Sequence, residues 1–471
     1  MTAPGLVVED IGFHERNLRL RTPFRFGIVT LTEATQVFVR VRVRLSDGST
    51  VEGQSAELLA AKWFDKNPDL SNEDNYDQLR AALSIARTAA VDAGEPLSAF
   101  GLHAAIAEAA YPECAARGLN GLIAGFGVAL VDRAVLDALC RAQGLSVFAA
   151  VQRNLPGIDA RTTPDLAGFD MSGFLQTLAP AQSIAVRHTV GLVDPITEAE
   201  IAPADRLNDG LPESLEAAVA TYGLRHFKLK VGGDMAADID RLTRIAAVLD
   251  RAEAPYLVSL DGNEQYEDAE AVLELLHRLG QEPALARLMR STAYLEQPIS
   301  RAHALERPVT ALAAHLPVII DESDSGIGVF PEARALGYAG ISSKSCKGVY
   351  RALLNRARVA KWTAEDGAKM FMTAEDLTTQ PGVALAQDLA LATLIGCTHV
   401  ERNGHHYVDG MAGAPEAEQQ RFLAAHPDLY RQDGGRVRVA ISDGRMAIGS
   451  LAAPALGTAV TPDWDSMGAA G

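Results

Sequence analysis

Five short polar motifs stand out in this sequence because each directly follows a run of apolar residues. They are Lys228-Leu229-Lys230, Asp261-Gly262-Asn263, Glu296-Gln297-Pro298, Asp321-Glu322-Ser323 and Lys344-Ser345-Cys346-Lys347. Their separations suit successive strands of one barrel. The carboxyl ends of such strands open on one face, so the motifs predict a single site that combines acids with lysines.

Three acids of this series, Asp261, Glu296 and Asp321, are predicted to bind one divalent cation. Carboxylate oxygens are hard donors that suit Mg²⁺, with Mn²⁺ as a substitute, and they differ from the His and Cys ligands of zinc. An octahedral ion held by three carboxylates keeps positions for a substrate carboxylate. The charge that develops there when an α-proton leaves would then be stabilised.

The lysines supply the acid and base groups of this prediction. Alternate residues of a strand share a face, so Lys228 and Lys230 point the same way. Lys230 is predicted to be the base, because burial and nearby positive charge favour loss of its proton. Lys228 is expected to orient or polarise the carboxylate. Lys344 comes from across the barrel and can act on the opposite face, with Lys347 as the second choice.

Eight strand-like runs alternate with helical segments in the second part of the chain. They cover residues 184–190, 225–231, 256–260, 293–296, 318–320, 340–343, 369–373 and 399–403. Repeated strand-helix units imply parallel pairing. The sequence therefore predicts an α/β fold with a TIM-like barrel of the (β/α)7β type. An open doubly wound sheet is the alternative, but no GxGxxG motif follows the first strand.

The first part of the chain has a different pattern. Residues 6–57 alternate between apolar and polar side chains, which predicts an antiparallel meander with a turn at 46–48. From residue 76 to about 143 the apolar spacing becomes helical. These elements predict an α+β domain over residues 1–155.

The domain boundary is placed inside residues 155–182, which carry Pro, Gly and Asp. The barrel is expected to occupy residues 180–430. The tail from about 430 to 471 is predicted to form a hairpin, with strands at 436–441 and 445–450, and to return to the first domain.

Composition sets the class of partner. The chain has 471 residues, 48% of them hydrophobic, and a formal charge of −17, which argues against nucleic acid or an anionic membrane as partner. A small anionic substrate at a local positive site remains compatible with this charge. The four cysteines are scattered, no signal peptide is recognisable, and no apolar run reaches about 18 residues. We expect a soluble, cytoplasmic protein.

Taken together, the motifs KLK at 228–230, DGN at 261–263, EQP at 296–298, DES at 321–323 and the Lys344/Lys347 pair resemble those of the enolase superfamily. The resemblance is to its mandelate racemase and muconate-lactonizing-enzyme family. It implies a capping domain that closes over the barrel mouth, Mg²⁺ bound by Asp261, Glu296 and Asp321, and an acid/base pair of Lys230 and Lys344. A small carboxylate substrate and a homo-oligomeric state are also implied.

Contacts to the substrate are harder to assign. The candidates are Asn263, Arg187, His188, Phe24, Phe26, Glu401, Asn403 and the aromatic and basic stretch at 62–66. A structural role is an equal alternative for Arg187 and His188, and core packing is an alternative for the two phenylalanines. The eighth strand carries Glu401-Arg402-Asn403 where dipeptide epimerases have Asp-x-Asp, so a dipeptide substrate is not supported.

Racemisation or epimerisation is the first expectation, because lysines flank both faces of the substrate. Cycloisomerisation and β-elimination of water would use the same residues. Two readings belong to other classes: a barrel lysine could form a Schiff base, as in aldolases, or the barrel could be a binding protein without turnover. Neither explains why acids and lysines recur at consecutive strand ends.

Overall fold

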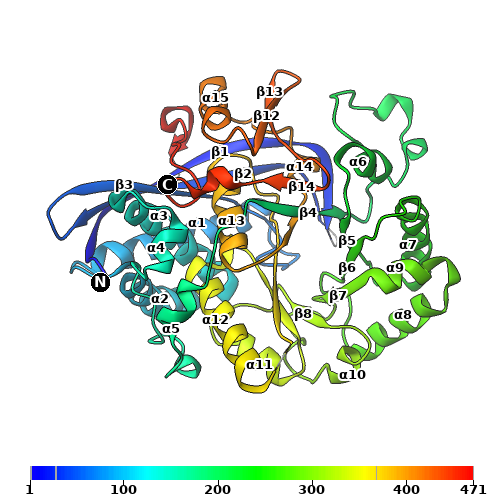
Figure 1. Ribbon diagram of the computed structural model, residues 1–471, viewed down its shortest axis with the longest axis horizontal. Coiled ribbons are helices and arrows are strands. Elements are labelled where there is room, and N and C mark those ends of the chain that lie inside the picture. The colour runs from blue at the N-terminus through cyan, green and yellow to red at the C-terminus, as the bar shows by residue number, and fades with distance from the viewer. Residues whose placement is uncertain (1–2, 27–28, 368, 470–471) are drawn as a thin grey trace.

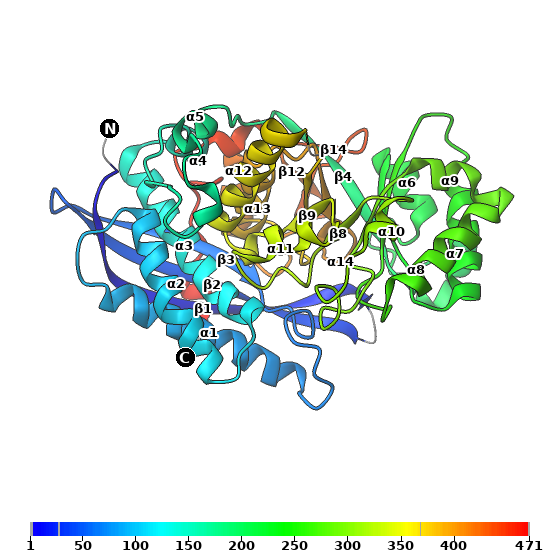
Figure 2. The ribbon, with the colours of Figure 1, turned by 90° about the horizontal axis from the view of Figure 1, so that it is seen from below.

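The computed structural model describes residues 3–26, 29–367 and 369–469, without the side chains of residues 25, 26 and 29. The predicted contact Phe26 therefore has its side chain outside the described residues. The chain forms a parallel barrel and an N-terminal α+β cap that lies against it (Figure 1). Seen from below, the strands of the cap extend beneath the barrel (Figure 2).

Eight parallel strands form the barrel in chain order, and the last pairs with the first. They are β4 (Ser183–Val190), β5 (His226–Lys230), β6 (Leu257–Asp261), β7 (Thr292–Glu296), β8 (Val318–Ile320), β9 (Gly340–Ser343), β10 (Phe371–Ala374) and β11 (His399–Arg402). The intervening helices are α6 (Leu215–Tyr222), α7 (Met235–Leu249), α8 (Ala269–Gln281), α9 (Ala286–Ser291), α10 (Thr310–Ala313), α11 (Val329–Ala335), α12 (Val349–Asp366) and α13 (Val383–Leu394). Closure of the barrel confirms the predicted fold and excludes the open sheet.

The cap consists of an antiparallel sheet covered by helices. Its strands are β1 (Leu6–Phe26), β2 (Val29–Leu45), β3 (Thr50–Leu58) and the short β15 (Gly468–Ala469), in the order β15-β1-β2-β3. Its helices are α1 (Asn72–Asp92), α2 (Ala99–Ala116), α3 (Gly121–Gln143), α4 (Val147–Gln152) and α5 (Met171–Gln176). A capping box of Ser71 and Asp74 starts α1.

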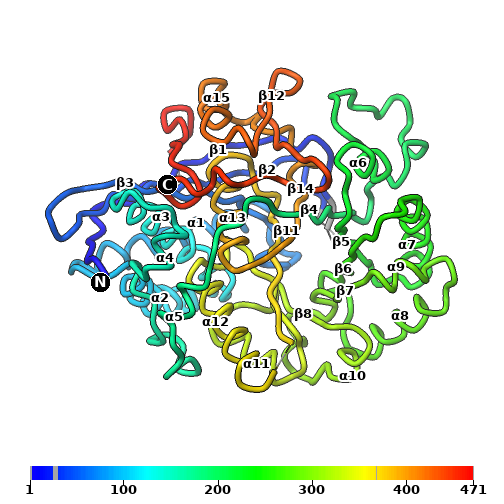
Figure 3. Tube along the Cα trace, in the orientation of Figure 1, coloured from blue at the N-terminus to red at the C-terminus, as the bar shows by residue number. Residues whose placement is uncertain are grey.

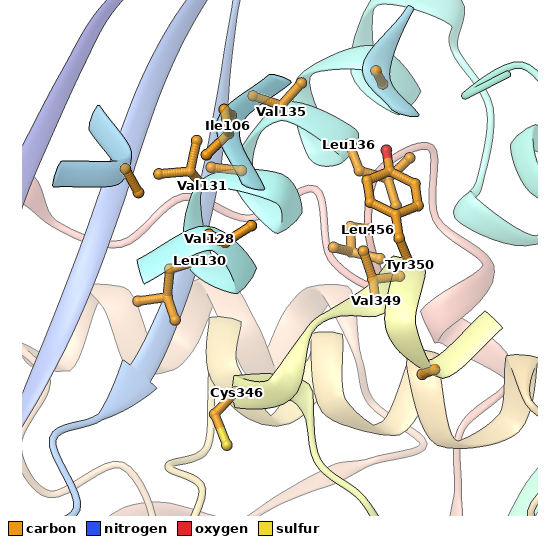
Figure 4. Close-up of a cluster of buried hydrophobic side chains, with 14 of the residues drawn as sticks. Ile106, Val128, Leu130, Val131, Val135, Leu136, Cys346, Val349, Tyr350 and Leu456 are labelled. Carbon is orange, nitrogen blue, oxygen red and sulfur yellow. The ribbon is translucent and has the colours of Figure 1, made fainter. Parts of the chain in front are cut away.

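Helix α3 joins the cap to the barrel through one hydrophobic core. Its residues from Leu122 to Cys140 are all buried, because the helix lies between the cap sheet and the barrel. Figure 4 shows side chains of α3, including Val128 and Leu136, with Val349 and Tyr350 at the start of α12. Leu456, near the C-terminus, belongs to the same cluster. The cap is therefore packed firmly on the barrel.

The predicted C-terminal hairpin is wrong. Strand β13 (Arg436–Val439) pairs with β12 (Tyr430–Asp433), whereas β14 (Arg445–Ala447) pairs antiparallel with β4. The backbone of Gly444 explains the difference, since its N–H donates to the Tyr222 carbonyl and its carbonyl accepts from the N–H of Val186. These bonds hold β14 at the barrel instead of beside β13.

Two further helices, α14 (Gly404–Tyr407) and α15 (Glu416–Ala425), precede these strands. After β14 the chain runs back along the cap, as the trace in Figure 3 shows. Gln54 of β3 donates to the carbonyl of Val460, and Arg141 of α3 donates to the carbonyls of Thr458 and Ala459. The tail thus adds hydrogen bonds to both layers of the cap.

None of the helices in the described ranges is long and apolar enough to cross a bilayer. The four cysteines carry free thiols, three of them buried and Cys397 partly buried.

The contact between β3 and α3 leaves no room for a side chain at Gly53. A Cβ atom there would lie 2.1 Å from the carbonyl oxygen of Ala134 and 2.5 Å from the backbone nitrogen of Ala138. We expect Gly53→Ala to lower the free energy of unfolding by about 1–3 kcal/mol, measured by urea unfolding, because backbone must move. Gly280→Ala in α8 is the control, since nothing lies within 4 Å of the new atom. Equal stability of both variants would contradict this packing.

Candidate active site

Strand register brings the predicted catalytic and metal-binding residues to one rim of the barrel. Lys230, Asp261 and Glu296 are the last residues of β5, β6 and β7, and they are direct neighbours in the sheet. Asp321 directly follows β8, and Lys344 directly follows β9. All five side chains are at most 7% exposed. The rim is the carboxyl end of the strands, where this architecture places active sites.

The backbone at this rim is strained. Asn263, Glu264, Gln297 and Thr378 all have left-handed φ values, of 40°, 68°, 31° and 57°. Such conformations cost on the order of 1–3 kcal/mol each and persist where surrounding contacts enforce them. The side-chain oxygen of Gln297, for example, accepts from the backbone N–H of Asp321 at 2.8 Å. The strained turn after β7 therefore fixes the position of Asp321.

The ammonium group of Lys228 lies among four carboxylates. Its Nζ atom is 2.8 Å from Glu375, 2.9 Å from Glu296, and 3.0 Å from both Asp261 and Glu401. Burial acts to lower the pKa of Lys228, but the carboxylates outweigh it and the pKa lies well above its ordinary value. The four carboxylates around one ammonium group distinguish Lys228 from the other lysines of the site and suit it to orienting groups.

Lys230 and Lys344 line one cavity from opposite sides of the barrel, because β5 and β9 are four strands apart in a ring of eight. Lys230 Nζ is 2.5 Å from Asp261 Oδ2, and Lys344 Nζ is 2.6 Å from Asp321 Oδ2. Burial acts to lower the pKa of Lys344, but the negative charges of Asp321 and other nearby carboxylates together outweigh it, so the pKa lies above its ordinary value. Lys347 also binds Asp321, at 2.9 Å.

The predicted metal ligands are paired with these lysines. Within the described ranges, no group of three or more His, Cys, Asp or Glu side chains is arranged to hold a metal ion. Glu296 Oε2, however, is buried without a hydrogen-bond partner among the described residues. Burial, with the charge of Glu375, raises the pKa of Glu296 well above its usual value. A hard cation would satisfy this oxygen. The oxygens of Asp261, Glu296 and Asp321 therefore fit Mg²⁺, provided that they bind the cation in place of the lysines.

A cavity lies between the cap and the barrel mouth. Nine residues predicted from the sequence line it: Phe24, Trp63, Lys228, Lys230, Asn263, Asp321, Lys344, Glu401 and Asn403. The other lining residues are Leu31, Leu58, Ala60, Asp376, Leu377 and Thr378. Asp261 and Glu296 adjoin this cavity through their bonds to Lys230 and Lys228. The barrel thus contributes the charged wall and the cap an apolar one.

Two predicted substrate contacts do not line this cavity. Arg187 is fully buried and forms an ion pair with Glu375 while it contacts His399 at 2.6 Å. His188 lies in a cluster of histidines, with Nδ1 3.0 Å from His405 Nε2. Both positions correspond to the structural alternative given for these residues.

Sequence reasoning missed Glu375, which directly follows β10 and binds both Lys228 and Arg187. Burial acts to raise its pKa, but the two cations lower it well below its usual value. The signal was present, because Glu375 follows a strand in the same way as the other acids. Its neighbour Glu401 differs, since burial raises the pKa of Glu401 to about 7.

A profile of the enolase C-terminal domain-like family matches residues 210–464, more than half of the chain. The chain belongs to this family. The match spans all the polar motifs that line the barrel mouth, and the recognised enolase-superfamily resemblance is confirmed. Members of this superfamily are isomerases and lyases that use Mg²⁺, and this protein is an enolase-superfamily enzyme. No curated protein sequence matches the chain.

Solved structures share the fold at low sequence identity. A dipeptide epimerase from Cytophaga hutchinsonii, complexed with Mg and D-Ala-L-Val, has 14% identity and a TM-score of 0.60, covering 98% of this chain and 99% of its own. An enolase from Bradyrhizobium, complexed with magnesium and mandelic acid, has 17% identity and a TM-score of 0.58, covering 99% and 98%. Muconate lactonizing enzyme from Pseudomonas fluorescens, complexed with muconolactone, has 17% identity and a TM-score of 0.56, covering 98% of both chains. These likenesses extend over the cap as well as the barrel.

The histidine cluster beside the site predicts acid sensitivity. Burial lowers the pKa of His188 and of His406 to about 3, and it also lowers that of His405. The unfolded chain, with histidine pKa values of about 6.5, binds more protons below that pH. The free energy of unfolding should therefore fall from about pH 6.5 toward about pH 3, by up to about 1.4 kcal/mol per pH unit for each histidine.

Urea unfolding at several pH values between about 7.5 and about 5 measures this slope. His406→Gln should make the slope shallower, because one titrating group is removed. His277→Gln is the matched control at an exposed position in α8. A slope unchanged in His406→Gln would show that this histidine is protonated in the folded protein.

Proposed function

We propose that this enzyme removes the α-proton of a small carboxylate substrate with the help of Mg²⁺, and that it is a racemase or epimerase. The observation that carries the proposal is the placement of Lys230 and Lys344 on opposite sides of one cavity. A substrate between them meets an amine on each face. Proton removal at one face and return at the other inverts the carbon.

Asp261, Glu296 and Asp321 would hold the cation. When bound, Mg²⁺ would balance the substrate carboxylate and the negative charge that develops on it as the proton leaves. Lys230 Nζ takes or gives the proton on one face, and Lys344 Nζ does so on the other. Lys228 remains an ammonium group and orients the surrounding carboxylates. The cap excludes water from the reacting carbon.

A second candidate reaction is β-elimination of water. Glu401 favours it, because its carboxyl group lines the same cavity and burial raises its pKa to about 7. Such a group can donate a proton to a leaving hydroxyl near neutral pH. Cycloisomerisation would use the same lysines and acids. A Schiff-base mechanism is disfavoured, since Lys228, Lys230 and Lys344 are each bonded to a carboxylate.

Exchange of the α-proton in D2O tests the proposal. With Mg²⁺ and N-acylated amino acids or 2-hydroxy acids, ¹H NMR should show deuterium incorporation in both enantiomers of a substrate. Lys230→Met and Lys344→Met should each lower exchange of one enantiomer by about 10²–10⁴-fold, the usual size of general acid–base catalysis. Loss of water instead of exchange would indicate the eliminase.

Lys369→Met is the matched control, because Lys369 is exposed and lies outside the cavity. Full activity in EDTA, together with borohydride trapping of a carbonyl substrate, would overturn the proposal in favour of Schiff-base chemistry.

Metal binding can be measured without any substrate. We expect calorimetry to detect Mg²⁺ binding and the melting temperature to rise with Mg²⁺ concentration by mass action. Glu296→Gln should weaken binding by more than the roughly 10–100-fold that outer-sphere changes cause. Glu274→Gln, an exposed acid in α8, should leave it unchanged. Equal Mg²⁺ affinity in both variants would remove Glu296 from the ligand set.

A further inference from the structure

The cap contributes only apolar side chains to the described wall of the cavity. They are Phe24, Leu31, Leu58, Ala60 and Trp63, each at most 7% exposed. Leu377 of the barrel adds to the same wall. A part of the substrate that reaches this wall leaves water and gains no charged partner from these residues. The wall therefore favours an apolar group.

Trp63 is fixed in this wall by bonds to the barrel. Arg301, after β7, donates to the carbonyl of Trp63 at 2.9 Å and to that of Phe64 at 3.0 Å. Its guanidinium also binds both carboxylate oxygens of Glu264, at 2.7 and 2.8 Å. Lys66 forms an ion pair with the same Glu264. The segment that carries Trp63 is thus anchored at both its backbone and its side chains.

The ring of Trp63 covers the amine on one side of the cavity. Lys344 Nζ lies 5.2 Å from the centre of the ring, within the range of a cation–π contact. A substrate whose α-carbon lies beside Lys344 would place a neighbouring substituent near this ring. The aromatic face suits a compact phenyl or branched aliphatic group.

The polar groups on the remaining wall are mostly engaged. Asp376 accepts from the backbone N–H groups of Thr379, Asn403 and Gly404. Glu401 accepts from Thr189 at 2.6 Å and from Lys228. Asn403 Oδ1, in contrast, is buried and has no hydrogen-bond partner among the described residues. Asn403 thus offers an uncharged hydrogen-bond acceptor to a substrate.

We infer that the substrate is a monocarboxylate with a compact apolar substituent seated against Trp63 and one neutral hydrogen-bonding group, such as a hydroxyl or an amide N–H, directed to Asn403. A second carboxylate, an amine or a polyhydroxylated chain would be buried without partners on this wall, and such burial is unfavourable. This inference rests on the proposed function and specifies its substrate class.

A substrate panel tests the class. With Mg²⁺ in D2O, N-acetylphenylalanine and 2-hydroxy-4-methylpentanoate should exchange their α-proton at least about tenfold faster than malate or gluconate. The first two compounds bury an apolar group against the wall, whereas the other two would bury polar groups there without partners, and such a difference changes the rate by about tenfold or more. Equal or faster exchange of malate or gluconate would overturn the inference and leave the proposed function intact.

Variants of the wall locate the effect. Trp63→Ala should raise KM for the two apolar substrates by about tenfold with a smaller change in kcat, and Trp63→Phe should restore most of the loss. Asn403→Leu should weaken the same substrates, because their polar group loses its partner. Trp464→Phe, a tryptophan outside the cavity, is the matched control. Unchanged KM in Trp63→Ala would overturn the role of the ring.

Failure of the proposed function is distinguished by binding. If no compound exchanges its α-proton, the proposed reaction is wrong. The melting temperature of the protein with Mg²⁺ and each compound then still tests the inferred substrate class, because a bound compound raises it. Greater stabilisation by N-acetylphenylalanine than by gluconate would support the inferred class. Equal or greater stabilisation by gluconate would overturn it.

Discussion

The site depends on the ammonium group of Lys228. Four buried carboxylates surround it, and without its charge they would repel one another at the centre of the barrel. Burial of ionised groups is costly unless each finds a partner of opposite charge. Lys228 provides that partner, and Arg187 supports it by binding Glu375 from the other side. The remaining lysines can then face the cavity.

The cap reinforces this arrangement through a buried polar contact. Glu57 of β3 binds Arg133 of α3 at 3.2 Å and accepts a hydrogen bond from Ser345 at 2.9 Å. Burial raises the pKa of Glu57, and the nearby arginine opposes that shift. Because Ser345 adjoins Lys344, the cap holds the segment that carries one of the two lysines proposed to transfer the proton. The position of the Lys344 amine therefore depends on how the cap packs against the barrel.

The barrel and the cap contribute different kinds of side chain to the same cavity. The barrel places charges where strands end, and these charges suit proton transfer beside a carboxylate. The cap supplies the apolar wall, held in place by Arg301 and Glu264. In the proposed function, the barrel would carry out the proton transfer and the cap would select the substrate. Functions can diverge on one fold through such separable sites.

The sequence by itself determined the eight barrel strands and the residues at their ends. Short apolar runs define parallel strands, and the alternation of side chains sends Lys228 and Lys230 to the same face. The acids Asp261, Glu296 and Asp321 follow such runs, so their common rim was predictable from local pattern. The α+β character of the first part of the chain was predictable for the same reason.

Tertiary structure alone decided which distant segments meet. The pairing of β14 with β4, the anchoring of Trp63 by Arg301 and the removal of Arg187 from the cavity wall all join residues far apart in the chain. Periodicity describes one element at a time and carries no information on its partners. Side-chain contacts between elements arise only when the barrel closes and the cap packs against it, because burial and charge pairing are then satisfied together.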